Sequence, residues 1–438
     1  MINKKEARIL LAGAALFLFF SFALFTVAKT HCDIDSKAYI ERALAMYNHH
    51  SFMVTPGEHL PYYALGYSLF LSFVYGVVGN SVGGIVCAQV LLALLCGLIL
   101  FFTARTLFGQ PVALLTFLLF CTNIGVITFA QFILTETLLA TFLLLFFACF
   151  TAFLQKFSYW SLSLAGLCFG LSIIVEPAAL LYVICLFPLF LCCRQEVSWG
   201  KKFSWVLLFI VCMASPVVCY MGHNKATFGV FSLGSLGKVN LYFWLLPNVL
   251  AQVHGTTSDH ERVILQKLDG GYASFERVER LFKETLIHYP HAFLMVWGKN
   301  VAKTLLGLFT SNLRLLVDDH VRGGDVSFFK YSGTLLQKIV KYLDGGAACW
   351  WLFYIAFAEM VWTILRWIFV FIALGSLFVQ RQWVWLYFIG SYISYFSMIA
   401  GHDGCARFRL MFEFVLIVLV ACGIVLIYEW FLRWRQHA

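Results

Sequence analysis

The chain has 438 residues, 61% of them hydrophobic and only 12% charged, and its mean hydropathy is +0.84. Soluble domains carry about 25% charged residues, so this composition excludes a soluble globular protein and predicts an integral membrane protein. The formal net charge of +9 does not indicate nucleic-acid binding, because the basic residues are scattered through predicted loops, where positive charge orients membrane proteins.

An apolar run over residues 9–27 follows three basic residues near the N-terminus. It is longer than the apolar core of a signal peptide, which has about 7–15 residues, so we expect a retained membrane anchor. The predicted spans after this one are 82–103, 111–128, 135–154, 159–175, 177–193, 204–221, 350–379, 384–400 and 409–431. Together they predict an all-α polytopic bundle of about ten transmembrane helices.

Two more apolar segments, 62–79 and 292–309, are better explained as helices lying in the extracytoplasmic interface. If 62–79 crossed the membrane, the basic residues of several short loops would move outside, against the positive-inside tendency. Lys299 and Lys303 lie one turn apart on the otherwise apolar 292–309, which is typical of an interfacial helix.

The predicted organisation has three parts. Residues 1–221 form a transmembrane core whose first outer loop, 29–81, holds a candidate site. Residues 222–345 are extracytoplasmic and carry the second interfacial helix, and 346–438 form the C-terminal transmembrane helices. Because the predicted number of membrane crossings is even, both termini lie on the same side, and the basic residues of the loops make this the cytoplasmic side.

The fourteen cysteines lie mostly singly inside predicted spans, where cysteine behaves as a small hydrophobic residue. No CxxC pair is present, so nothing in the sequence supports a zinc or iron–sulfur site, and we predict no metal. Cys32 and Cys405 differ, because each lies outside the membrane beside a candidate motif. If both motifs line one cavity, we expect these thiols to be close together without a disulfide, although an oxidising compartment permits one.

Ionisable side chains gather at the predicted extracytoplasmic ends of the helices, where charge so close to hydrocarbon marks a function or a partner. The Asp33-x-Asp35 pair has three readings: metal ligand, general base or solvated loop. Glu136 begins the fourth predicted span, where the helix dipole alone also favours an acid. Arginines in the last outer turn suit bidentate phosphate recognition, or else they reach lipid headgroups. The whole set is Asp33, Asp35, Glu136, Glu176, His402, Arg407 and Arg409.

Four short motifs follow one another along these outer ends. They are Asp35-Ser36-x-x-Tyr39-x-x-x-Ala43 with Pro61 and Gly66-Tyr67-Ser68-Leu69-Phe70-Leu71, then Thr135-Glu136, Gly166-Leu167-x-x-Gly170-Leu171 before Pro177, and Arg407-Phe408-Arg409-Leu410. Their order and sidedness resemble the GT-C glycosyltransferases, in the protein-mannosyltransferase-like branch that uses polyprenyl-phosphate sugars and includes the aminoarabinose lipid A transferases. The resemblance covers residues 10–195 and 385–430.

Two positions depart from the family pattern. Glu176 stands before the proline where the family usually has Arg, which changes the charge at the site. Leu65-Gly66-Tyr67-Ser68 stands in place of Pro-Gly-Tyr-Pro, which alters only local geometry.

The resemblance implies transfer of a sugar from a polyprenyl-phosphate donor to a glycolipid, polysaccharide or protein acceptor. The reaction would take place at the extracytoplasmic face of a membrane, most simply the bacterial inner membrane with the site facing the periplasm or exterior. Phosphate is an acceptable leaving group, so a carboxylate base and cations suffice. Asp35 is our first choice as base and Asp33 the second, with Glu136 as a third catalytic residue. Substrate binding is expected from Tyr39, His59, Glu176, His402, Arg407 and Arg409.

Two other classes stay open. A lipid-linked saccharide flippase or transporter also carries intramembrane charge, and Glu359 and Arg366 lie seven residues apart on one helix face. Transporters, however, place such charges within repeated halves, and we find no internal repeat. A non-catalytic scaffold leaves the clustering of charged motifs on one side unexplained.

Overall fold

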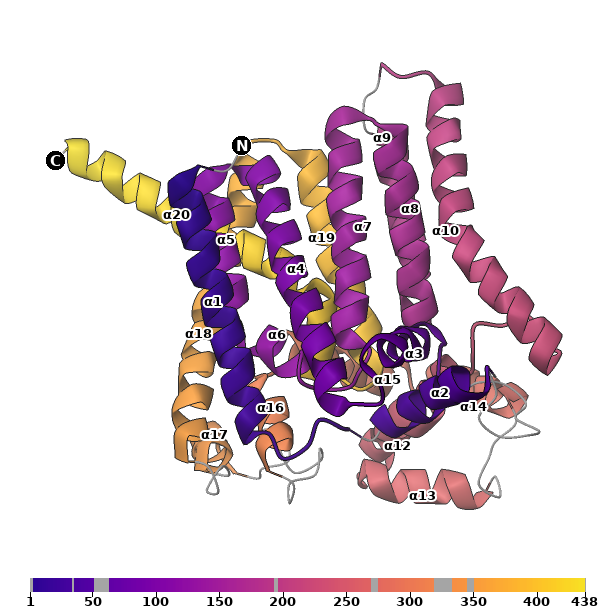
Figure 1. Ribbon diagram of the computed structural model, residues 1–438. Coiled ribbons are helices and arrows are strands. Elements are labelled where there is room, and N and C mark those ends of the chain that lie inside the picture. The colour runs from indigo at the N-terminus through magenta and orange to yellow at the C-terminus, as the bar shows by residue number, and fades with distance from the viewer. Residues whose placement is uncertain are drawn as a thin grey trace.

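The computed structural model describes residues 3–33, 35–50, 63–192, 196–268, 275–318, 333–344 and 350–437. The regular elements of these segments are all helices, arranged as a bundle of long helices with a layer of shorter ones across one end (Figure 1). Both chain termini lie at the opposite end of the bundle (Figure 1).

Seven of the described helices are long and apolar enough to cross a membrane. They are α1 (Lys4–Val27), α4 (Val82–Phe108), α7 (Glu136–Lys156), α10 (Trp199–Phe228), α18 (Trp350–Val379), α19 (Trp383–Ile399) and α20 (Leu410–His437). Three shorter apolar helices fall in the remaining predicted spans: α5 (Gln110–Cys121), α8 (Tyr159–Val175) and α9 (Tyr182–Cys192). The prediction of an all-α polytopic bundle is therefore confirmed.

One predicted span, 111–128, is not a single helix. It divides into α5 and α6 (Ile124–Phe129) at Asn123, whose side-chain oxygen accepts a hydrogen bond from the Val126 N–H at 3.0 Å. The same side chain donates to Glu413 Oε1 of α20 at 2.9 Å. An asparagine that caps a new helix favours a break here, although the surrounding residues are uniformly apolar.

Close helix packing explains the glycines of the Gly166-x-x-x-Gly170 motif. A Cβ on Gly166 would lie 2.7 Å from the carbonyl oxygen of Phe209, and one on Gly170 would overlap the carbonyl of Met213. Both carbonyls belong to α10, so the two glycines let the backbones of α8 and α10 approach each other. Such contacts between small residues stabilise helix pairs in membranes, where apolar side chains gain little by leaving lipid.

A further set of short helices, from the loops between the long ones, covers the end of the bundle that lies away from the termini (Figure 1). In the first outer loop they are α2 (Ser36–His49) and α3 (Gly66–Val78). In the second half they are α11 (Leu236–Asn240), η2 (Leu241–Leu245), α12 (Leu246–His254), α13 (Ser258–Leu268), α14 (Phe275–His288), α15 (Pro290–Leu306), α16 (Thr310–Val317) and α17 (Leu335–Asp344). Helices α3 and α15 occupy the two segments predicted to be interfacial.

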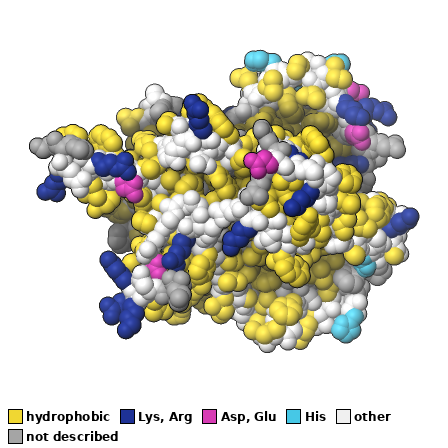
Figure 2. All heavy atoms as spheres, turned by 90° about the horizontal axis from the view of Figure 1, so that it is seen from above, with side chains coloured by type: hydrophobic (Ala, Val, Ile, Leu, Met, Phe, Trp, Pro, Cys, Tyr) yellow, Lys and Arg dark blue, Asp and Glu magenta, His cyan; other side chains and the backbone are white. Residues whose placement is uncertain are grey.

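The opposite end carries basic side chains. Seen from that end, the surface shows Lys and Arg in several separate groups between hydrophobic side chains (Figure 2). This distribution agrees with a cytoplasmic position of the termini. The side of the membrane, like the division of the chain into three parts, stays a prediction.

Candidate active site

The first outer loop is attached to the segment that precedes α7. The His31 carbonyl accepts a hydrogen bond from the Ile133 N–H at 2.8 Å, and His31 Nδ1 lies 3.0 Å from the Gln131 carbonyl oxygen. The loop then turns into α2, where the Asp33 N–H donates to Ser36 Oγ at 2.8 Å. These bonds hold the Asp-x-Asp stretch beside the start of α7, one hundred residues further along the chain.

Asp35 occupies the N-cap position of α2, but its side chain makes no capping bond. Its carboxylate instead accepts a hydrogen bond from the Tyr63 hydroxyl at 2.7 Å through Oδ1. Its second oxygen, Oδ2, lies 3.1 Å from Nη1 of Arg407. The side chain is 29% exposed. Loop capping therefore does not account for Asp35, which faces a shared polar site.

Arg407 joins the parts of this site. It lies in η6 (Ala406–Arg409), and its Nε donates to Glu136 at the first turn of α7. Its Nη1 bonds to Asp35 and is 3.9 Å from Asp33 Oδ2. The guanidinium thus sits among three carboxylates from two distant segments, and such charge-assisted bonds are the strong ones.

Glu176 lies at the turn between α8 and η1 (Pro177–Ala179), beside a small cavity. Burial raises the pKa of Glu176 to about 7, against the opposing effect of the Ala178 backbone N–H and with a further rise from the Glu136 charge. The cavity has a volume of about 30 Å³, enough for one water molecule. Its lining is Thr135, Glu136, Leu139, Glu176, Arg407, Phe408, Leu410 and Met411.

Tyr39 packs beneath the site and does not face its carboxylates directly. Its ring is buried and packs against the rings of Tyr63 and Tyr67, with centroids 4.8 Å and 5.1 Å away. The Tyr67 hydroxyl donates to Gln89 Oε1 at 2.7 Å, and Gln89 Nε2 donates to the Phe132 carbonyl at 2.8 Å. The tyrosines therefore connect α2 to α3, α4 and the segment before α7. Burial raises the pKa of Tyr39 well above its ordinary value.

Two residues of the site were not found from the sequence. Tyr63 holds Asp35, and buried Arg42 donates through Nη1 to the Tyr63 carbonyl at 2.9 Å. Arg42 lies seven residues after Asp35, which places it on the same face of α2 two turns later. This seven-residue spacing could have indicated from the sequence that Arg42 lies near Asp35.

The remaining candidates lie elsewhere. Arg409, grouped with the substrate-binding residues from the sequence, is buried and bonds to Glu413 Oε2 at 2.9 Å and to the Gly307 carbonyl at 2.6 Å. His402 packs on Phe408, with ring centroids 5.1 Å apart, and does not line the cavity beside Glu176. His59 is outside the described residues.

Cys32 and Cys405 are free thiols. The bonds of Arg407 nevertheless show that the first outer loop and the last outer turn share one site. Among the described residues, no group of three or more His, Cys, Asp or Glu side chains has an arrangement that would hold a metal ion.

The comparison with known proteins agrees with this architecture. Residues 63–220 match the family model described as dolichyl-phosphate-mannose-protein mannosyltransferase, which covers less than half of the chain. No curated protein matches the chain by sequence.

Two solved archaeal structures share the fold, and a third structure is less similar. The apo oligosaccharyltransferase of Archaeoglobus fulgidus has a TM-score of 0.57 at 12% identity, over 98% of this chain and 51% of that one. The AglB oligosaccharyltransferase of the same organism, in complex with an inhibitory peptide and a dolichol-phosphate, has a TM-score of 0.55 at 9% identity, over 97% and 51%. ArnT from Cupriavidus metallidurans, bound to undecaprenyl phosphate, has a TM-score of 0.45 at 13% identity, over 95% and 77%.

The chain spans about half the length of the archaeal enzymes that it matches, and at these identities the likeness is one of fold. The chain thus has the fold of the GT-C membrane proteins, and its residues 63–220 resemble the dolichyl-phosphate-mannose-protein mannosyltransferase family.

Proposed function

We propose that this protein transfers a sugar from a polyprenyl-phosphate donor to an acceptor at the extracytoplasmic face, with Asp35 as the general base. The observation that carries the proposal is the contact of Arg407 with both Asp35 and Glu136. It brings a base and a phosphate-binding cation together beneath the interfacial helices, at the end of the bundle away from the termini.

Binding of the donor phosphate to Arg407 and release of Asp35 from Arg407 occur together. A donor phosphate competes with the two carboxylates for the guanidinium of Arg407, whose planar fork matches phosphate geometry. When the guanidinium turns to the phosphate, Asp35 Oδ2 loses its bond to Arg407. Phosphate binding therefore frees this oxygen to accept the proton of the acceptor when the donor is in place.

The bond changes then balance. The acceptor gives its proton to Asp35, and the acceptor atom forms a bond to the anomeric carbon of the sugar. The bond between that carbon and the phosphate oxygen breaks, and the polyprenyl phosphate leaves with the electron pair. Tyr63 holds Asp35 in place through its hydroxyl, and Glu136 keeps Arg407 within reach of the phosphate.

Glu176 adjusts the charge of the site. A carboxyl with a pKa of about 7 is partly protonated near neutral pH, which lowers the negative charge that an incoming phosphate meets. This effect compensates in part for the acid that stands where the family usually has an arginine.

Two observations support the donor and the location. The archaeal AglB structure that shares the fold was determined with a dolichol-phosphate, a polyprenyl-phosphate lipid. The basic groups on the opposite end favour an extracytoplasmic site, and we place the protein in the bacterial inner membrane with the site facing the periplasm.

The structure weakens the argument for a transporter. Glu359 accepts hydrogen bonds from the Phe309 and Thr310 N–H groups at 2.6 Å and 2.8 Å, so it caps α16. Arg366 bonds to Glu413 at 3.2 Å instead of to Glu359. The pair that favoured a transporter therefore connects helices within the bundle.

The test is an assay with purified protein, a panel of labelled polyprenyl-phosphate sugars and a membrane extract as the acceptor source. We expect label to move from at least one donor into an extract fraction, and Asp35→Asn to lower that rate 10²–10⁴-fold with unchanged thermal stability. Asp33→Asn is the matched control and should be affected less. Undiminished transfer by Asp35→Asn would remove the base assignment, and no transfer from any donor by folded protein would overturn the proposal.

A further inference from the structure

A buried stretch of backbone between α6 and α7 is neither helix nor strand. It runs over residues 130–135, here named the α6–α7 connection, and each of its residues is at most 4% exposed. Irregular backbone inside a membrane bundle cannot be satisfied by lipid, so its N–H and C=O groups need partners within the protein. The side chains that supply these partners determine where the connection lies.

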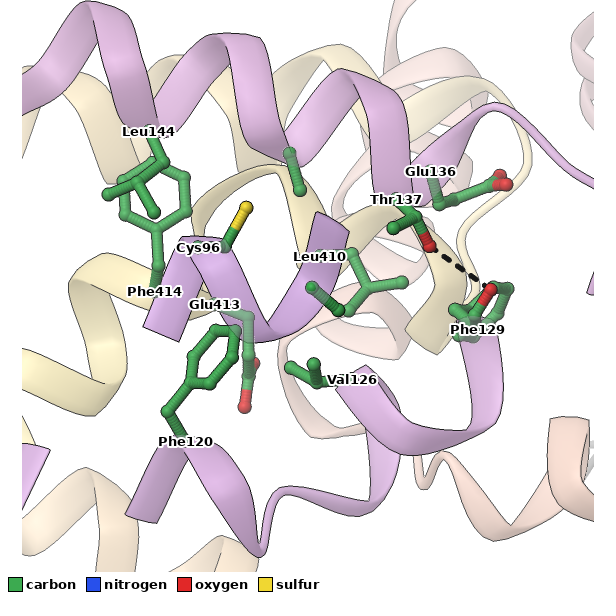
Figure 3. A pocket seen from close by; sticks show the side chains of 12 residues that line it. Cys96, Phe120, Val126, Phe129, Glu136, Thr137, Leu144, Leu410, Glu413 and Phe414 are labelled. Atoms are coloured by element: carbon green, nitrogen blue, oxygen red, sulfur yellow. Dashed lines mark hydrogen bonds between the residues drawn. The ribbon is translucent and has the colours of Figure 1, made fainter. Parts of the chain in front are cut away.

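The α6–α7 connection touches both halves of the candidate site. On one side the Ile133 N–H donates to the His31 carbonyl at 2.8 Å, two residues before the Asp-x-Asp pair. On the other side the connection leads directly into Glu136, the carboxylate at the first turn of α7. The Thr137 hydroxyl closes this end by donating to the Phe129 carbonyl at 3.1 Å, beside the Glu136 side chain (Figure 3). The position of the connection thus sets the separation of the carboxylates that share one guanidinium.

Gln89 of α4 holds the middle of the connection. Its side chain is completely buried, and its Nε2 donates to the Ala130 carbonyl at 3.2 Å and to the Phe132 carbonyl at 2.8 Å. Because a carbonyl can only accept, the NH₂ group must face the connection, and Oε1 is left for the Tyr67 hydroxyl, which donates to it at 2.7 Å. Both amide hydrogens and one oxygen lone pair are therefore in use.

This set of bonds requires a glutamine. Glutamate lacks the two amide hydrogens, methionine has no donor, and asparagine is one methylene shorter. Tyr67 in turn packs edge-on against Tyr39, one turn after Asp35 on α2, with ring centroids 5.1 Å apart. The carboxamide of Gln89 thus contacts the connection directly and reaches the helix of Asp35 through Tyr67.

The choice of an amide inside a membrane helix points to a role in the site. Residues 82–102 of α4 contain Gln89 as their only amide or charged side chain. Polar side chains are unfavourable inside a membrane bundle, and a continuous helix through residues 124–156 would satisfy its own backbone without one. The irregular connection and its glutamine occur instead at the place where the chain meets the first outer loop.

We infer that Gln89 is a positioning residue for sugar transfer, an inference that rests on the proposed function. Its carboxamide fixes the α6–α7 connection, and the connection holds Asp35 and Glu136 at the separation that Arg407 spans. Gln89 acts only through the backbone that it holds. A misplacement of about 1 Å between reacting groups can lower a rate about 10²-fold, so a side chain outside the site can control the rate in this way.

The test compares Gln89→Met with Thr141→Val in the purified full chain. Methionine is close to glutamine in length but leaves the two carbonyls of the connection without their donor. Thr141→Val is the matched control, because Thr141 is also buried and its hydroxyl donates to the Thr137 carbonyl at 2.7 Å and lies 3.1 Å from Cys96 Sγ of α4. Each variant removes buried polar contacts of α4, but only Gln89→Met releases the connection.

The kinetic readout is the split between kcat and KM for the polyprenyl-phosphate donor. We expect Gln89→Met to lower kcat about 10–100-fold with little change in KM, and Thr141→Val to keep the kcat of the wild type. Tyr67→Phe keeps both Nε2 bonds and should lower kcat about 2–10-fold, the effect of one neutral hydrogen bond. Equal kcat values in Gln89→Met and Thr141→Val would overturn the inference. If Gln89→Met does not fold, an unchanged kcat in Tyr67→Phe would overturn it.

Hydrogen exchange separates this inference from the proposed activity. The Ile133 amide is protected by the His31 carbonyl, so Gln89→Met should speed exchange in peptides covering residues 130–136 and 29–33, whereas Thr141→Val should not. Mass spectrometry of the folded proteins measures this without any donor. If the wild type transfers sugar from no donor, the proposed function fails and exchange alone decides the role of Gln89. Unchanged exchange in Gln89→Met would show that Gln89 does not hold the connection.

Discussion

Two arginines separated by one phenylalanine have different surroundings. The Arg407 side chain is 20% exposed and holds the carboxylates of two distant segments, whereas that of Arg409 is 1% exposed and bonds to Glu413 and to backbone carbonyls. In a 3₁₀ turn each residue advances by about a third of a turn, so positions two apart point to different sides. The accessible arginine has partners that a phosphate can replace, and the buried one has partners that are part of the fold.

The largest effect should come from removing the buried arginine. Arg409→Ala leaves the Gly307 carbonyl and one side of Glu413 without a partner. Breaking a buried pair from one side costs about 3–5 kcal/mol, so we expect a much lower yield of folded protein and a lower unfolding temperature. Arg407→Ala is the comparison and should stay folded. If Arg407→Ala unfolds and Arg409→Ala does not, the two roles are exchanged.

Arg407→Lys sharpens the comparison. Lysine keeps the charge but lacks the planar fork, so we expect weaker binding of undecaprenyl phosphate than in the wild type and stronger binding than in Arg407→Ala. The affinity is measured by titration with the labelled lipid, with circular dichroism as the check on folding. Unchanged affinity in the alanine variant would show that Arg407 contacts only lipid headgroups or its carboxylates.

Glu176 predicts a pH dependence. Its folded pKa of about 7 lies above the ordinary value of about 4.3, so the folded protein binds more protons between these pH values. The wild type should therefore lose stability as pH rises from about 4 to about 7, and donor affinity should fall as Glu176 ionises. Glu176→Gln should flatten both profiles. The measurements are unfolding temperature and donor affinity from pH 4 to 8, and identical profiles in the two proteins would exclude this role.

The smallest expected effect concerns the orientation of Asp35. Tyr63→Phe removes one hydrogen bond to a charged group, worth about 1.5–3 kcal/mol, so kcat should fall about tenfold or more with little change in KM. Tyr39→Phe is the matched control, since it keeps the ring packing and leaves the Tyr63 bond intact. A larger loss in Tyr39→Phe than in Tyr63→Phe would contradict the positioning role of Tyr63.

The sequence predicted the bundle, the interfacial helices and the meeting of Asp35, Glu136 and Arg407, because hydrophobic runs and charge sidedness determine them. It did not predict that Arg409 is buried while Arg407 is accessible. Arg409 is held by the backbone carbonyls at the end of α15, and the sequence does not reveal that contact. It also missed the break at Asn123, because its single polar signal lies within an apolar run. The sequence did not predict the bond between Tyr63 and Asp35, because this bond depends on how α2 packs against α3.

The six residues of α6 lie between the buried cluster of Arg366, Arg409 and Glu413 and the site around Arg407. At one end Asn123 binds Glu413, and at the other the Phe129 carbonyl accepts a hydrogen bond from Thr137, next to Glu136. The helix is about 9 Å long, so its length sets the distance between the buried Glu413 and the candidate catalytic residue Glu136. One inserted residue would turn its two ends by about 100° relative to each other, and both anchors would not hold at once.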